Sequence, residues 1–319
     1  MVRSAELPSL NRLACSVRRW LWRRWPPVLA LGGGGARGFA HLGVLEVLEQ
    51  AGLSVRAVAG TSMGAVVGAM YLTEGSAAAA LERWREARAR GLMPTVQSTG
   101  SMAASDPGEH PLVQVARRIR SRVVISFAVS RPTMLDGGDL VRALEFLLPE
   151  ADIEDLPKPL CVVATDLETG EEVRLARGPL RPAIRASSSI PGLLPATAMD
   201  GRLLVDGGVV AEVPVAAARA LGRPVVAVDV SMALPPLATS GLVLDTMIRA
   251  QAMTGSLLRR QQLRQADHVL RPEIGAVTWA DWDAFDRLVE CGRVAARRWL
   301  GLPEPAPPAA AELLPESQP

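Results

Sequence analysis

The chain has 319 residues, a formal net charge of +2 and only 4% aromatic residues. This length suits one large α/β domain or two small ones, and either would bury a substantial core. The nearly balanced charge and the few aromatic side chains argue against a nucleic-acid partner, because such proteins carry basic patches and stacking surfaces.

The three cysteines, Cys15, Cys161 and Cys291, lie far apart and lack C-x-x-C spacing. We therefore expect no disulfide framework and a reducing, cytoplasmic environment. No apolar stretch reaches the roughly 18 residues that a spanning helix requires, and the first residues lack the apolar core of a signal peptide. Neither export nor membrane spanning is expected.

Residues 1–27 form a basic, tryptophan-rich N-terminal arm. Its segment 17–25 mixes four arginines with three tryptophans. This composition is typical of segments that lie in the headgroup region of a membrane. We expect peripheral contact at the inner face of the membrane, with a merely solvated arm as the alternative.

Beyond the arm, apolar runs of strand length alternate with segments of helical periodicity, which predicts a mostly parallel sheet covered on both faces. Asp139 is expected to cap a helix, and Asp200-Gly201 predicts a tight hairpin turn. Residues 93–111 predict a mobile excursion and residues 303–319 a disordered Pro/Ala-rich tail. Strands are expected at 28–31, 55–59, 160–164, 203–205, 225–230 and near Val269, and helices at 36–51, 65–71, 77–90, 139–148, 213–221, 245–265 and 282–299.

Ser62 lies between a strand-like and a helix-like run, within Gly60-Thr61-Ser62-Met63-Gly64. A serine hydroxyl is a weak nucleophile unless a sharp turn holds it clear of its neighbours and toward a base. The flanking Gly60 and Gly64 would let the strand and the helix approach closely, as in a G-x-S-x-G nucleophile elbow. The motif has a substantial chance background, so its structural context carries the interpretation.

A glycine-rich loop over residues 32–38 follows the first strand and opens a helix, so several backbone N–H groups converge on one point. The expected anion is the pyrophosphate of a dinucleotide, whose G-x-G-x-x-G fingerprint the loop matches, or the oxyanion of acyl transfer. The dinucleotide interpretation requires an acidic residue after the second strand, where Ser62 stands instead. We favour an oxyanion hole built from Gly33, Gly34 and Gly35, with a structural tight turn as the alternative.

The serine needs a base. The histidines are His41 in the helix after the glycine loop, His110 in the excursion and His268 beside a late strand, and each fits a structural or surface role better. A buried carboxylate can serve instead. Two Asp-Gly-Gly sequences compete, and Asp206 is favoured over Asp136 because it ends an apolar strand at the carboxyl edge of the sheet.

Three motifs now stand in order: Gly33-Gly34-Gly35-x-Arg37-Gly38, Gly60-x-Ser62-x-Gly64 and Asp206-Gly207-Gly208. Their order and spacing resemble those of the patatin-like phospholipases, and residues 185–192 and 201–214 add to the likeness, which covers roughly residues 28–222. Some members of the family carry aspartate before the three glycines. Here Gly32 stands at that position, which resembles the bacterial and neuropathy-target-esterase-like branch.

The resemblance implies a three-layer α/β/α fold with a mostly parallel central sheet. Residues 28–222 would form the hydrolase core and residues 223–302 a C-terminal α/β extension packed on the same domain. It also implies a Ser62–Asp206 dyad without histidine, acting on lipid acyl esters without a metal or cofactor. Arg37 and Gly38 would complete the oxyanion-hole loop, Arg37 by orienting the loop or facing a phosphate headgroup, with an ordinary surface cation as the alternative.

The alternative function is a non-catalytic module that uses the glycine loop to bind an acyl lipid or a nucleotide. The sequence leaves the lipid headgroup, the acyl chain, the positional preference and the oligomeric state open.

Overall fold

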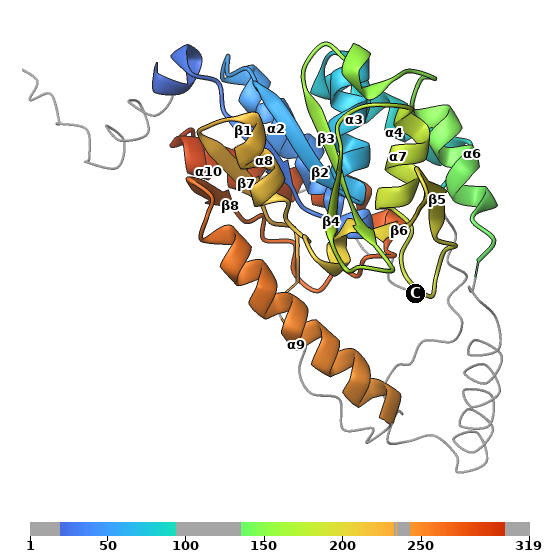
Figure 1. Ribbon diagram of the computed structural model, residues 1–319. Helices are drawn as coiled ribbons and strands as arrows, with labels where there is room; N and C mark the ends of the chain where they lie inside the picture. The colour runs from blue at the N-terminus through green and yellow to red at the C-terminus, as the bar shows by residue number, and fades with distance from the viewer. Residues whose placement is uncertain (1–19, 94–134, 233, 235–242, 304–319) are drawn as a thin grey trace, which may run out of the picture.

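An eight-stranded sheet with the order β5-β6-β3-β2-β1-β7-β8, and with β4 paired to β3, lies at the centre of the fold (Figure 1). The computed structural model describes residues 20–93, 135–232, 234 and 243–303. The five strands from β3 to β8 in that order are parallel, and β4, β5 and β6 are antiparallel additions. The strands are β1 (Val28–Leu31), β2 (Ala57–Thr61), β3 (Leu160–Asp166), β4 (Glu172–Leu175), β5 (Thr197–Met199), β6 (Arg202–Asp206), β7 (Val225–Val228) and β8 (His268–Leu270).

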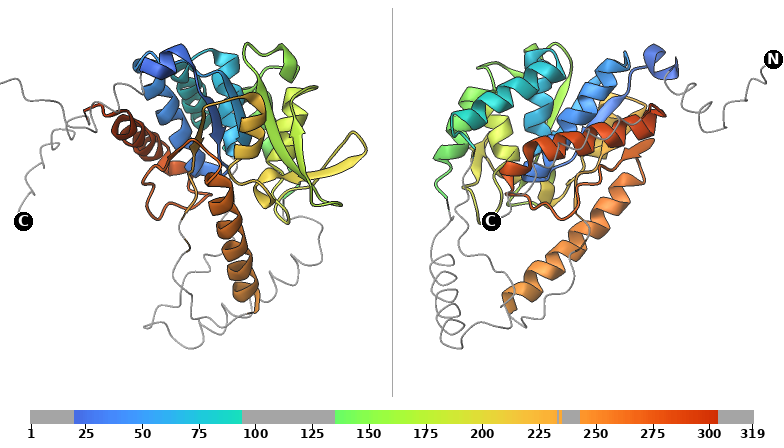
Figure 2. Two further views of the ribbon diagram at one scale, coloured as in Figure 1. Left: turned by 60° about the vertical axis from the view of Figure 1, so that its left-hand side comes forward. Right: turned by 180° about the vertical axis from the view of Figure 1, so that it is seen from behind.

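Helices cover both faces of this sheet (Figure 2). The α-helices are α2 (Ala40–Gln50), α3 (Met63–Glu74), α4 (Ala77–Ala89), α6 (Gly138–Leu147), α7 (Leu180–Ser187), α8 (Val215–Leu221), α9 (Val243–Leu263) and α10 (Phe285–Leu300). Short 3-10 helices are η1 (Gly35–Phe39), η2 (Ile153–Asp155), η3 (Gly207–Val209) and η4 (Trp282–Ala284).

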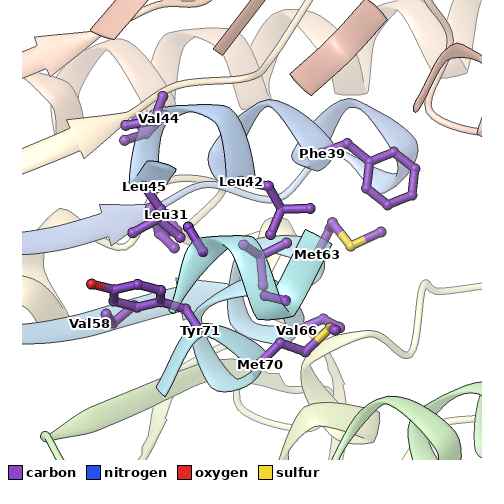
Figure 3. Packing of buried hydrophobic residues seen from close by; sticks show 14 of the residues in the cluster. Leu31, Phe39, Leu42, Val44, Leu45, Val58, Met63, Val66, Met70 and Tyr71 are labelled. Atoms are coloured by element: carbon purple, nitrogen blue, oxygen red, sulfur yellow. The ribbon is translucent and has the colours of Figure 1, made fainter. Parts of the chain in front are cut away.

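The central strands send alternate side chains into two separate apolar cores. In β1, Leu29 and Leu31 join the larger core with α2, α3 and α10, part of which Figure 3 shows, whereas Val28 and Ala30 join the smaller core with α8. Strands buried on both faces are typical of parallel sheets. The expected three-layer, mostly parallel architecture is thereby confirmed.

Two early boundaries differ from the sequence prediction. The helix expected over residues 36–51 divides into η1 and α2, and the second strand begins two residues later than expected and runs through Thr61. The strand reaches this far because Gly60 and Thr61 pair with β3. As a result the elbow follows the last paired residue directly, and α3 begins at Met63.

The expected cap of α6 was wrong. The N-cap residue is Gly137, in the left-handed region with φ 84°, and Asp139 lies within the first turn. The carboxylate that accepts a hydrogen bond at this end belongs to Asp136, 2.8 Å from the Gly138 nitrogen. Glycine adopts positive φ without steric penalty, so the turn needs no side-chain cap.

The hairpin predicted at Asp200-Gly201 is confirmed. Both residues have positive φ, 50° and 74°, and they join antiparallel β5 to β6. A two-residue turn with positive φ at both positions matches the twist of the strands it connects. The hairpin directs β6 toward the centre of the sheet and so sets the position of Asp206.

Three expected segments lie mostly or wholly outside the described residues: the arm up to residue 19, the excursion from residue 94 and the tail from residue 304. The described end of the arm is a helical turn over residues 20–24. There Trp22 is buried against Trp299, with ring centroids 4.3 Å apart, whereas Trp20 and Trp25 are exposed.

Helices α2 and α10 cross at unusually close range because each presents a glycine to the other. A Cβ added at Gly43 would lie 1.9 Å from the carbonyl oxygen of Val289, and one at Gly292 would lie 1.9 Å from that of Ala40. Both obstacles are backbone atoms, which cannot rotate away. The contact therefore depends on the absence of side chains at both positions.

We expect Gly43→Ala to lower the free energy of unfolding by about 1–3 kcal/mol, the usual effect of overpacking a well-filled core. Gly255→Ala in α9 is the matched control, because a Cβ there meets nothing within 4 Å. That control should be neutral or stabilising by up to about 1 kcal/mol, since alanine is the better helix former. Urea denaturation of the two variants checks the difference, and equal stabilities would contradict the packing argument.

Candidate active site

Strands β2 and β6 meet end to end along one side of β3, and this junction brings Ser62 near Asp206. Residues 162–163 of β3 pair with both β2 and β4, so these two strands lie on opposite sides of β3. Residues 164–165 pair with both β4 and β6, so β6 lies on the side that β2 occupies. Thr61 at the end of β2 and Asp206 at the end of β6 consequently face successive residues of β3.

Ser62 occupies a sharp turn between β2 and α3, with φ 52° and ψ −125°. A non-glycine residue with positive φ is strained, and such strain persists only where the surroundings enforce it. Close packing enforces it here: a Cβ at Gly60 would lie 2.5 Å from the Ala65 Cα, and one at Gly64 would lie 2.1 Å from the Leu31 oxygen. This is the geometry of a nucleophile elbow.

The Asp206 carboxylate is buried beside the Ser62 hydroxyl, which favours its ionised form. The N–H of Gly208 donates a hydrogen bond of 2.7 Å to Oδ1. Burial raises the pKa of Asp206 to about 6, because lost hydration disfavours the ionised form more than these two groups favour it. Asp206 is thus a stronger base than an exposed carboxylate and is still mostly ionised at pH 7.

Asp136, the rival carboxylate, is exposed and serves the first turn of α6 through its bond to the Gly138 N–H. It lines the same cavity as Ser62. Within the described residues, however, the carboxylate that contacts the Ser62 hydroxyl is that of Asp206.

Ser187, at the end of α7, fills the gap between the ends of β2 and β6. The N–H of Ser62 donates to Ser187 Oγ at 2.8 Å, and this hydroxyl donates to the carbonyl oxygen of Val163 at 2.6 Å. One side chain therefore satisfies two backbone groups where the ladder between β2 and β3 stops. The sequence analysis missed this role, for which the run of three serines at 187–189 was the available signal.

The glycine loop passes directly beside the elbow, since a Cβ at Gly33 would lie 3.3 Å from the Ser62 Cβ. Its expected donors need correction at Gly33, whose N–H already donates to the Glu212 carbonyl at 2.8 Å. The Ala36 N–H likewise donates to the Trp279 carbonyl. The backbone N–H groups of Gly34 and Gly35 have no hydrogen-bond partner in the described part of the chain.

Arg37 and Gly38 contribute to the conformation and packing of the glycine loop. Arg37 Nε donates to the Gly34 carbonyl at 3.0 Å, across the turn of the loop. A Cβ at Gly38 would lie 2.2 Å from Met63 Cγ, so glycine allows η1 to approach the start of α3. Burial lowers the pKa of Arg37, although nearby Glu212 opposes this.

His41 contacts the start of the glycine loop through its side chain. Its ring is fully buried, and Nε2 lies 2.8 Å from the Gly32 carbonyl oxygen. Burial lowers the pKa of His41 to about 4, so the ring is neutral at pH 7. The ring of His268 packs against that of Trp22, with the ring centroids 5.2 Å apart. His110 lies outside the described residues.

Glu212 joins the glycine loop to α9. Its carbonyl holds the Gly33 N–H, and its carboxylate accepts a 2.9 Å hydrogen bond from Arg259 of α9. Arg259 also lies 3.9 Å from the carboxylate of buried Asp229, which accepts a 3.1 Å bond from Arg271. The root of α9 and the back of the loop thus belong to one ionic network, which the sequence analysis did not anticipate.

An apolar cavity of about 120 Å³ adjoins Ser62 and Gly35. Leu140 and Leu144 of α6 line one part of it, and Trp84, Trp279 and Trp282 also line it. A mostly apolar cavity beside a few converging polar groups suits an acyl chain whose carbonyl must be oriented.

The described end of the arm lies far from this cavity. Trp25 comes just before β1, and Ser62 follows the end of parallel β2, so the two lie at opposite edges of the sheet. Among the described residues, no helix is both long and apolar enough to cross a membrane. The same residues bring no group of three or more His, Cys, Asp or Glu side chains together as a metal site.

We expect Ser187→Ala to lower the free energy of unfolding by about 1–3 kcal/mol, because the buried Ser62 N–H and Val163 carbonyl would each lose a partner. Ser188→Ala is the matched control, since Ser188 Oγ is buried without a hydrogen-bond partner in the described structure. Chemical denaturation of both variants provides the measurement. A larger loss for Ser188→Ala would contradict the proposed bridging role of Ser187.

Comparison with known proteins identifies a matching family and several relatives. A family profile described as patatin-like phospholipase matches residues 29–219. An uncharacterised NTE family protein of Mycobacterium tuberculosis is 35% identical over 191 residues, which cover 59% of this chain and 44% of that protein. A second such protein from the same species is 28% identical over 298 residues, covering 85% of this chain and 46% of that protein.

The mouse protein named patatin-like phospholipase domain-containing protein 6 is 34% identical over 206 residues, covering 63% of this chain and 13% of that protein. The chain therefore spans less than half the length of these curated relatives. The solved structure of VipD from Legionella pneumophila gives a TM-score of 0.41 at 18% identity, covering 86% of this chain and 66% of that chain.

Proposed function

The chain belongs to the patatin-like phospholipase family, and from this premise we propose that it is a serine acyl-ester hydrolase of the phospholipase A or lysophospholipase type. The observation that carries the proposal is the position of the Ser62 hydroxyl, on its strained elbow, beside the buried carboxylate of Asp206. An oriented hydroxyl with an adjacent base is what nucleophilic catalysis requires.

In the proposed reaction, Asp206 accepts the Ser62 proton while Ser62 Oγ forms a bond to the ester carbonyl carbon. The free N–H groups of Gly34 and Gly35 donate hydrogen bonds to the resulting oxyanion. The tetrahedral intermediate expels the alcohol, which takes the proton from Asp206, and leaves an acyl group on Ser62. Asp206 then removes a proton from water, which attacks the acyl carbonyl carbon. The bond to Ser62 Oγ breaks, Asp206 returns the proton to Ser62 Oγ, and the fatty acid is released.

The loop geometry supports Gly34 and Gly35 as the donors in place of the wider set expected from the sequence. Gly35 has φ 56°, and a Cβ there would lie 2.3 Å from the Trp279 carbonyl oxygen. Only glycine fits that position without moving the chain beside the apolar cavity. Arg37 and His41 would position the loop through the carbonyls of Gly34 and Gly32.

The apolar cavity supports an acyl-chain substrate, with the headgroup left outside. Peripheral membrane contact through residues 17–25 is a separate proposal, supported by the exposure of Trp20 and Trp25. It would hold the chain by the edge of the sheet opposite Ser62.

We expect Ser62→Ala to reduce hydrolysis of p-nitrophenyl esters by about a thousandfold or more, as removal of a nucleophile does elsewhere. A fluorophosphonate probe should label the parent at Ser62 and leave the variant unlabelled. Unchanged hydrolysis by Ser62→Ala would rule out Ser62 as the nucleophile. A parent that is neither labelled nor active would favour a non-catalytic lipid- or nucleotide-binding module instead.

We expect kcat/KM to rise with pH and to reach half its plateau near pH 6, where Asp206 loses its proton. Below this pH the carboxyl group is protonated and cannot accept the Ser62 proton. A pH profile on a soluble ester, recorded where the protein stays folded, provides the test. A plateau that extends unchanged to pH 5 would contradict the role of Asp206.

Asp206→Asn serves as the control for that profile. Because burial raises the pKa of Asp206 from 3.8 to about 6, its ionisation at pH 7 opposes folding by at most about 3 kcal/mol. The asparagine variant should therefore be inactive yet at least as stable as the parent at pH 7. An inactive variant that has also lost stability would point to disrupted folding instead.

A further inference from the structure

Most of the exposed large apolar side chains gather on the edge of the sheet that carries Ser62. Three of those in the described residues, Trp20, Leu21 and Trp25, belong to the arm at the opposite edge. Of the others, Leu167, Val209 and Leu234 come after strands, Leu203 lies in β6 opposite Leu167, Trp279 stands beside the cavity, and Met247, Met253 and Leu257 project from α9.

Helix α9 projects from the molecule at this edge. Figures 1 and 2 show it extending away from the body of the molecule beside the carboxyl ends of the strands. Its C-terminal end is fixed, because Arg259 binds Glu212, Gln262 donates to the Val210 carbonyl at 2.6 Å and Leu263 enters the smaller core.

The projecting part of α9 exposes apolar side chains on one face. Met247, Ala250, Met253 and Leu257 are spaced by three or four residues, which places them on one side of a helix. Met247 is 63% exposed, and Met253 and Leu257 are each 53% exposed. About three turns of helix thus present flexible apolar side chains to the outside.

The charge of α9 is predominantly positive. The helix contains three arginines, Arg249, Arg259 and Arg260, and one acidic residue, Asp245, in its first turn. Arg259 is engaged by Glu212, whereas Arg260 is exposed. An apolar helix face flanked by arginines is complementary to a lipid surface with anionic headgroups, where apolar side chains enter the headgroup region and cations stay at its surface.

The cavity beside Ser62 reaches the same edge. Trp279 lines this cavity and is 39% exposed. A lipid surface against α9 and Trp279 would therefore adjoin the entrance to the site, whereas a surface bound only by the arm would lie at the far edge.

We propose that α9, through Met247, Met253 and Leu257, is the surface that docks this protein on anionic lipid membranes with Ser62 facing the lipid. This deepens the proposed hydrolase function and rests on it for the meaning of the orientation. The docking itself can be measured without catalysis.

The experiment compares full-length variants in a Ser62→Ala background for co-sedimentation with vesicles of phosphatidylcholine alone or mixed with phosphatidylglycerol. We expect M247S/M253S/L257S to lower partition onto the mixed vesicles by at least about tenfold, since burial of each apolar side chain contributes to binding. Q251S/Q261S is the matched control, with the same change to serine at exposed polar positions of α9, and it should bind as the parent does. W20S/W25S tests the arm and should retain most of the partition.

Activity gives a second readout with Ser62 restored. The α9 triple variant should hydrolyse a soluble p-nitrophenyl ester as the parent does but should hydrolyse vesicle-embedded phospholipid at least about tenfold more slowly. If the parent hydrolyses neither substrate, the proposed function fails while the partition result still decides the docking proposal.

Two results would overturn the docking proposal. One is a parent that does not bind the mixed vesicles, and the other is a triple variant that binds them as well as the parent does. If that unchanged partition comes with a smaller particle size in size-exclusion chromatography, the α9 face is instead an interface between copies of the chain.

Discussion

Strand β3 holds β2 and β6 end to end on one side, and the site follows from what happens at the gap between them. The chain must leave the sheet at Ser62, because the next position along β3 is occupied by Asp206 at the end of the opposing strand. Backbone groups at this interruption would be buried without partners, and Ser187 supplies both a donor and an acceptor. A break in the hydrogen-bond ladder thereby becomes the place where a hydroxyl and a carboxylate meet.

The surroundings of this junction keep two unfavourable arrangements in place. Ser62 has a strained backbone, and Asp206 is a carboxylate with little access to water. Both lie against strands buried between two apolar cores, whose packing supplies the stability that such a site consumes. The close crossing of α2 and α10 at Gly43 and Gly292 belongs to that supporting framework.

The sequence predicted the layers, the parallel core of the sheet and the proximity of a serine elbow to the glycine loop. These features depend on apolar runs, glycines and their order, which are local signals. Strand β4 and helix α7 were not predicted. Both are short, with four and eight residues, and α7 lies in a proline-containing segment, so a pattern within either is hard to distinguish from chance.

The details of the site also exceeded what a pattern can specify. Whether a glycine N–H is free depends on which carbonyl faces it, and Gly33 is taken by Glu212, nearly 180 positions later in the chain. The bridging role of Ser187 likewise depends on the contact of α7 with β3. Hydrogen-bond partners distant in sequence are set by tertiary packing, so motif spacing predicted the participants but not the donors that stay available.

Glu212 holds its two partners by different means. It grips the glycine loop with a main-chain oxygen and α9 with its side-chain carboxylate. Replacing this glutamate by an uncharged residue would remove the hydrogen bond to Arg259 of α9 and leave the backbone attachment to the loop chemically intact. Mutation can therefore alter one of these two attachments without the other. The anchoring of α9 could change during evolution while the backbone N–H groups of the glycine loop keep their positions.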